Sequence, residues 1–239
     1  MLYYLWGTGL PANQIAVIIC AYLIAICFAL SIHELAHGLV AYWCGDRTAK
    51  AEGRLSLNPL KHLDPLGTLC LVLTGFGWAK PVHVNPLKFR NYKRDMALVS
   101  LAGVFTNIVI AFFFCPILMV SGGLLASTNL FYNFVYYLVE FTFAINISLG
   151  VFNLFPIYPL DGFNFINTFL KYDNKFANFM IKYGNIILVV LFLTGGFSYI
   201  FNWVIYGFEW LFVHFWGLMI WLKKNCKCQF RKTANIQLG

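Results

Sequence analysis

One pentapeptide of the chain combines residue types that bind and use a metal ion, His33-Glu34-Leu35-Ala36-His37. On a helix, residues four positions apart lie on one face about one turn apart, so both imidazoles can bind one zinc ion. The carboxylate between them then faces the metal-bound water, whose pKa zinc lowers to about 7, and can accept its proton. The pattern predicts His33 and His37 as ligands and Glu34 as general base. The competing interpretation is a hydrogen-bonded cluster that only holds helices together.

A catalytic zinc ion also needs a third protein ligand and an open fourth position. Glu52 follows the second histidine by 15 residues but lies in a polar, basic segment. Glu140 and Glu209 lie inside apolar segments, at depths that differ from that of the histidines. Asp161 follows a segment broken by two prolines, and extended backbone at membrane depth occurs only where it is buried in protein or lines a cavity. The spacing favours Asp161 as the third ligand. The alternative is that Asp161 is an ordinary capping or turn aspartate at a helix end.

These polar residues belong to a very apolar chain. Of its 239 residues 60% are apolar, 19% aromatic and 11% charged, and the mean hydropathy is +0.72. A soluble domain carries roughly 25% charged residues, so the composition excludes a soluble globule, a coiled coil and a disordered chain. It indicates an integral membrane protein. Ionisable groups inside a membrane span cost free energy and usually mark function, which strengthens the metal-site hypothesis.

The basic residues reveal the topology. All 17 Lys and Arg fall within 47–94, 171–182 and 223–232. The positive-inside rule explains this excess better than a nucleic-acid partner does. It places these three segments in the cytosol, so we expect a protein of the bacterial inner (cell) membrane with its N-terminus outside and its C-terminus inside.

Hydropathy divides the chain into elements consistent with that topology. The predicted full spans are 13–43, 96–120, 131–155, 183–200 and 203–222. Residues 66–79 are apolar but too short to cross about 30 Å, and basic residues flank both ends, which predicts a re-entrant segment. Residues 80–95 contain two prolines and predict extended chain or short strands. We expect an all-α polytopic membrane protein with about five to six transmembrane helices and a short re-entrant or β-like segment after the first long helix.

Two distant motifs resemble the site-2 proteases, the intramembrane zinc metalloproteases of peptidase family M50. The first is the pentapeptide, and the second is Asn153-x-x-Pro156-x-x-Pro159-Leu160-Asp161-Gly162. Between them, 58–68 and 75–86 resemble the compact subgroup without a PDZ domain. The resemblance implies that His33, His37 and Asp161 bind one Zn²⁺ per chain and that Glu34 is the general base.

Three further residues are candidates at lower rank. The resemblance implies that Asn153 lies near the metal and orients substrate or supports the oxyanion, whereas its chemistry alone equally suggests an amide satisfying backbone groups freed by the broken helix. Asn107 is similar to the polar end of a family pattern, although Val104 replaces the usual proline. His62 either contacts substrate or binds loop carbonyls as a structural histidine.

The chain is thus expected to be a zinc-dependent intramembrane metalloendopeptidase that cleaves in or near transmembrane segments of membrane proteins. Its expected partners are a transmembrane protein substrate, the lipid bilayer and a regulatory membrane protein. The alternatives are a polytopic transporter that uses the cluster for ion binding, or an inactive scaffold. The expected organisation is an extracytoplasmic N-terminus (1–12), a catalytic core (13–165), a transmembrane hairpin (166–222) and a basic cytosolic tail (223–239).

Overall fold

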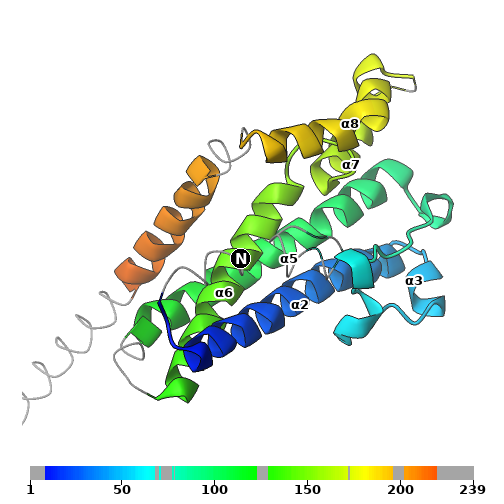
Figure 1. Ribbon diagram of the computed structural model, residues 1–239. Helices are drawn as coiled ribbons and strands as arrows, with labels where there is room; N and C mark the ends of the chain where they lie inside the picture. Colours follow the sequence, from blue (N-terminus) through cyan, green and yellow to red (C-terminus); the bar gives the residue numbers. More distant parts are fainter. Residues whose placement is uncertain are drawn as a thin grey trace, which may run out of the picture.

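The computed structural model describes residues 9–67, 70, 77, 79–122, 129–171, 173–195 and 202–219 (Figure 1). Its helices are α2 (Ala12–Trp43), α3 (Thr48–Ala51), α5 (Tyr92–Ser121), α6 (Leu130–Asn153), α7 (Asp161–Asn167) and α8 (Lys175–Leu193). Two short 3₁₀ turns, η1 (Pro59–Lys61) and η2 (Pro86–Lys88), lie between α3 and α5. Residues 202–219 are also helical. The tail from residue 220 onward lies outside the described residues.

Four described helices are long and apolar enough to cross a membrane, namely α2, α5, α6 and α8. The predicted all-α polytopic membrane class is therefore confirmed. The predicted span 13–43 agrees closely with α2, and 131–155 agrees with α6. Helix α5 begins at Tyr92 rather than at residue 96, because the Asn91 side chain accepts a hydrogen bond from Arg94 N and caps the helix.

The helix predicted at 183–200 instead forms α8, which begins at Lys175. Asn174 accepts hydrogen bonds from Phe176 N and Ala177 N, so the cap lies well before the apolar run. Lys175 and Lys182 are exposed, and their long side chains can reach from a helix end toward water. Lys175 and Lys182, which the hydropathy pattern left outside the predicted span, therefore belong to the helix.

Helices α2, α5 and α6 pack against one another and form the core. On α2 three fully buried alanines recur every four residues, Ala21, Ala25 and Ala29. Small residues at this spacing let neighbouring backbones approach closely, which drives helix association in a membrane where apolar burial alone contributes little. Short side chains on α2 therefore explain the close packing of the bundle.

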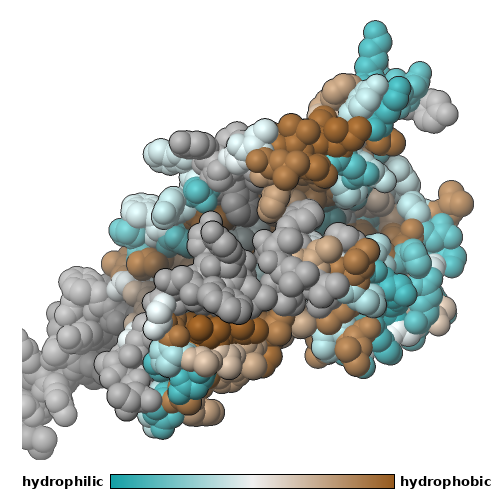
Figure 2. Space-filling view, viewed as in Figure 1, coloured by the Kyte–Doolittle hydropathy of each residue, from teal (hydrophilic) through white to brown (hydrophobic). Residues whose placement is uncertain are grey.

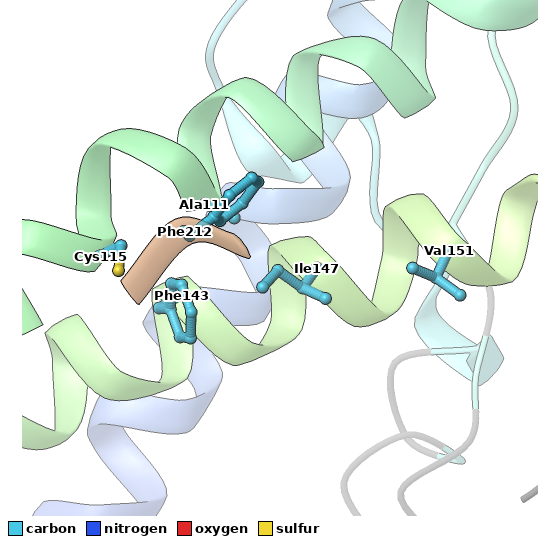
Figure 3. Packing of buried hydrophobic residues seen from close by; sticks show 6 residues of the cluster. All are labelled: Ala111, Cys115, Phe143, Ile147, Val151 and Phe212. Carbon is cyan, nitrogen blue, oxygen red and sulfur yellow. The ribbon is translucent and has the colours of Figure 1, made fainter. Parts of the chain in front are cut away.

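A second packing layer joins the helix at 202–219 to α5 and α6. Figure 3 shows Phe212 next to Ala111 of α5, in a cluster that also contains Cys115, Phe143, Ile147 and Val151. The indole N–H of Trp216 donates to the Phe112 carbonyl at 2.8 Å. These contacts attach the C-terminal helix to the core.

Helix α3 lies at one end of the bundle (Figure 1), where Figure 2 shows hydrophilic residues gathered, while hydrophobic ones predominate along the visible side of α2. Leu63 and Ala79 form an isolated antiparallel bridge, and Lys80 N donates to the His62 carbonyl at 2.7 Å. The chain just before the predicted re-entrant segment and the end of that segment therefore lie side by side. Most of its interior, 68–69, 71–76 and 78, lies outside the described residues.

Replacing Ile147 by Ala should lower the free energy of unfolding by about 2 kcal/mol or more, because the side chain is fully buried between α5 and α6 and its loss leaves a cavity. Thermal unfolding in detergent measures the change. The matched control is Ile117→Ala, since Ile117 on α5 is 46% exposed and should change the midpoint little. Equal shifts in both variants would contradict the packing described above.

Candidate metal centre

The structure brings together three of the predicted ligands. The His33 and His37 Nε2 atoms are 3.1 Å apart, and Asp161 Oδ2 lies 3.1 Å from the first and 3.2 Å from the second. Ligand atoms around a tetrahedral zinc ion are about 3.3 Å apart, so the three atoms have the spacing of one ion's ligand set. Both histidines are buried, and the Asp161 side chain is 15% exposed. Within the described residues this is the group of side chains whose ligand atoms converge in this way.

The far side of each imidazole has its own partner. His33 Nδ1 lies 3.2 Å from Asn107 Oδ1, and His37 Nδ1 lies 2.7 Å from the Val99 carbonyl. Both partners are acceptors, so each ring carries its hydrogen on Nδ1 and turns the lone pair of Nε2 toward the centre. Outer partners of this kind fix the orientation of metal-ligating histidines. Asn107 is fully buried, as a residue in this role should be.

The three ligand atoms are arranged to bind a cation. Two imidazole lone pairs and a carboxylate oxygen face one another, and Asp161 Oδ2 is buried without a conventional hydrogen-bond donor. Three acceptors at this spacing repel one another unless a positive charge lies between them. Gly103 of α5 supplies the space, because a Cβ there would lie 2.5 Å from His33 Cε1 and 2.6 Å from His37 Nε2. Nitrogen and carboxylate donors of this kind suit zinc.

Asp161 reaches the centre because α6 ends at Asn153 and the chain turns back before α7. Asp161 is the first residue of α7, which packs against α5. The following residue must be small, since a Cβ on Gly162 would lie 2.2 Å from the Leu154 carbonyl oxygen. The proline-broken segment thus folds back tightly and carries the carboxylate to the histidines of α2.

Glu34 lies on α2 between the two histidines, and its Oε2 accepts a hydrogen bond from the main-chain N–H of Val82 at 2.8 Å. The contact comes from segment 79–85, which lies outside the helices and precedes η2. Sequence reasoning gave no role to Val82 or Gly103. A backbone N–H has no side-chain signature, and the need for glycine at 103 arises only when α5 lies against α2.

The remaining candidates lie in other surroundings. The Asn153 amide donates to the Leu149 carbonyl of its own helix at 3.0 Å. His62 is fully buried, and its Nε2 contacts the Ser56 carbonyl at 2.8 Å, which is the bonding expected of a structural histidine. Glu52 pairs with His83 at 3.1 Å and is not part of the ligand group. Substrate-directed roles of Asn153 and His62 stay predictions.

Comparison with known proteins adds independent findings. Residues 125–193, which include Asp161, match the model described as "Peptidase family M50". A Bacillus subtilis (strain 168) protein named "Putative zinc metalloprotease YwhC" is 41% identical over 184 residues, which cover 74% of this chain and 82% of that protein. Proteins named "Putative zinc metalloprotease Rip2" from Mycolicibacterium smegmatis and Mycobacterium tuberculosis (strain H37Rv) are both 28% identical. Those matches cover 80% and 84% of this chain and 72% and 74% of the relatives. No solved structure matches the chain significantly.

Replacing Gly103 by Ala should weaken metal binding, because the added methyl group occupies the space of the two imidazoles. We expect purified protein to hold less than about half of the wild-type zinc, since ligands must be placed within a few tenths of an ångström. Elemental analysis measures the metal, and a thermal unfolding curve checks the fold. Gly122→Ala is the control, because nothing lies within 4 Å of a Cβ there. Full zinc occupancy in Gly103→Ala would show that the space is not needed.

Proposed function

The chain belongs to peptidase family M50, the family of the site-2 proteases, and from this premise we propose that it is a zinc metalloprotease that cleaves peptide bonds of membrane proteins within the bilayer. The observation that carries the proposal is the convergence of His33 Nε2, His37 Nε2 and Asp161 Oδ2 within 3.1–3.2 Å, beside a glutamate. The names of the similar proteins support zinc as the metal.

Each residue of the centre then has a defined task. His33, His37 and Asp161 would hold the zinc ion, which when bound polarises the scissile carbonyl and acidifies water. Glu34, held at Oε2 by Val82 N, has its other carboxylate oxygen available to accept a proton from water and to deliver it to the leaving amine. Asn107 and the Val99 carbonyl keep the imidazoles in the tautomer that binds metal.

The position of the centre along α2 supports cleavage within the membrane near one surface. Ten residues separate His33 from Trp43, the end of the helix, or about 15 Å of rise. The other end of α2, Ala12, is 21 residues away, or about 32 Å. The loops at the nearer end carry the basic cluster of 47–94, which the positive-inside rule assigns to the cytosol. The proposed orientation is therefore N-terminus outside and C-terminus inside, in a bacterial inner membrane.

A transmembrane substrate buries its carbonyls in helical hydrogen bonds and must unwind before attack. Segment 79–85 begins at the bridge residue Ala79 and ends at Asn85, whose backbone is extended, and we propose that it receives an unwound strand by β-addition. In an extended chain, alternate residues direct their N–H groups to the same edge. Val82 N–H points to Glu34, so an extended path would direct Val84 N–H to the same edge, and no partner binds it in the part of the chain that the structure describes. The proposed partners are a transmembrane protein substrate, the surrounding lipid and a regulatory membrane protein.

Glu34→Gln should abolish cleavage of a transmembrane reporter while zinc content stays near one ion per chain, because the amide cannot accept the proton but the ligands are intact. Asp161→Ala should lose both metal and activity. Elemental analysis and reporter cleavage in proteoliposomes measure the two effects.

Glu140→Gln is the matched control, as a substitution of another glutamate within a predicted span, and should cleave normally. A wild-type protein without zinc, or a cleaving Glu34→Gln variant, would overturn the hydrolase proposal. An ion transporter or an inactive scaffold would then be the better interpretation.

Val84→Pro should lower kcat/KM for the reporter by about tenfold with zinc content unchanged, because proline removes the N–H that would pair with the substrate strand. Val84→Ala keeps this N–H and serves as the control for the loss of the side chain. If the two variants cleave equally, the substrate does not pair with this edge.

A further inference from the structure

The carboxylate of Glu34 depends on a segment outside its own helix. Its Oε2 accepts from Val82 N, and Val82 lies in the middle of segment 79–85. The Val82 side chain is buried beside Gly38 of α2, and the other described backbone attachments of the segment lie at its ends. Whatever fixes the segment therefore fixes one oxygen of the proposed general base.

The two ends of the segment are attached to different partners. At its start, Leu63 bridges Ala79, and Lys80 N donates to the His62 carbonyl at 2.7 Å. At its end, Asn85 N donates to Asp46 Oδ2 at 2.7 Å. The second attachment joins the segment to the residues that directly follow α2, the helix that carries Glu34.

The Asp46 carboxylate joins segment 79–85 to the start of α3. It is fully buried, and its two oxygens serve two different partners. Oδ1 accepts from the backbone and hydroxyl of Thr48 at the start of α3, while Oδ2 accepts from Asn85 N. Burial works to raise the pKa of Asp46, but these hydrogen bonds and the nearby Lys88 ammonium hold it below its ordinary value. The side chain is thus ionised at neutral pH and offers acceptors on both sides.

We infer that Asp46 is a positioning residue for peptide-bond cleavage, acting through Asn85 on segment 79–85 and through Val82 N–H on Glu34. This inference rests on the proposed function. The path consists of two hydrogen bonds, 2.7 Å between Asn85 N and Asp46 Oδ2 and 2.8 Å between Val82 N and Glu34 Oε2, joined by the backbone from Val82 to Asn85. Because the same segment offers the Val84 edge to substrate, one element would align both the base and the peptide to be cut.

A second contact supports the same segment from outside. His83 Nδ1 lies 3.1 Å from Glu52 Oε2, and Glu52 directly follows α3. The His83 side chain is 66% exposed, so this pair is worth little by itself. Removing this pair should therefore also lower kcat, but by less than loss of the Asp46 contact does.

Asp46→Asn is the informative substitution. An amide keeps the size of the side chain but leaves one acceptor oxygen for partners on two sides, so the attachment between Asn85 N and Thr48 cannot be kept whole. The chain offers a matched control in Asp95, which is also fully buried and accepts from Asn91 N at 2.9 Å and from Arg94 Nε. Asp95 contacts the start of α5 and not segment 79–85, so Asp95→Asn reports the general cost of losing a buried carboxylate.

The experiment uses the zinc-loaded full chain and combines two measurements. Hydrogen–deuterium exchange of peptides covering 79–85 should become faster in Asp46→Asn and stay as in wild type in Asp95→Asn. Cleavage of the transmembrane reporter should show kcat lowered about tenfold or more in Asp46→Asn, because misplacing a catalytic group slows the chemical step. Zinc content should be unchanged. Glu52→Gln, an exposed change that does not endanger folding, should lower kcat about twofold.

Each outcome decides the inference. Faster exchange with unchanged kcat in Asp46→Asn would overturn it, since the segment would then move without disturbing the base. Equal losses in Asp46→Asn and Asp95→Asn would also overturn it, because the effect would be general destabilisation. If Asp46→Asn does not fold, unchanged exchange and kcat in Glu52→Gln would count against it. Failure of the proposed function is distinct, because the wild type itself would then not cleave.

Discussion

Three electron-rich atoms held 3.1–3.2 Å apart in an apolar helix bundle are the constraint on which the rest of the structure depends. Such an arrangement is unfavourable without a cation, and the protein maintains it by contacts on every side. Asn107 and the Val99 carbonyl orient the two rings, Gly103 removes the side chain that would displace them, and the folded-back segment before α7 carries Asp161 to them. Bundle packing, helix termination and the choice of glycine all serve this one geometry.

Much of this could be predicted from the sequence because the signals are local. The spacing of His33 and His37 on a helix, the long apolar runs, and the prolines before Asp161 each depend on residues near one another in the chain. The same holds for small turns: Asn58–Lys61 and Asn85–Lys88 have the identical sequence Asn-Pro-Leu-Lys. Each forms a 3₁₀ turn whose asparagine accepts from the leucine N–H.

What could not be predicted depends on contacts between distant segments. The Val82 N–H that binds Glu34 is a backbone group 48 residues away, and backbone groups leave no trace in residue types. Helix α8 begins before the predicted span at residue 183, because the Asn174 cap and the exposed lysine side chains extend the helix beyond the apolar run. Nothing in the sequence singles out Asp46, because an aspartate after a glycine is common in turns. Its burial and its hydrogen bonds to two segments become visible only in the folded structure.

The ligand set has a consequence for how the molecule is held together. His37 and Asp161 are separated by about half of the chain, so an ion shared between them closes a very large loop. Cross-links over long loops restrict the unfolded chain most, and metal-binding free energy becomes folding free energy when the site does not exist in the unfolded state. The metal would therefore hold α7 against α2, and removing it would loosen α7, a short helix that does not itself span the membrane.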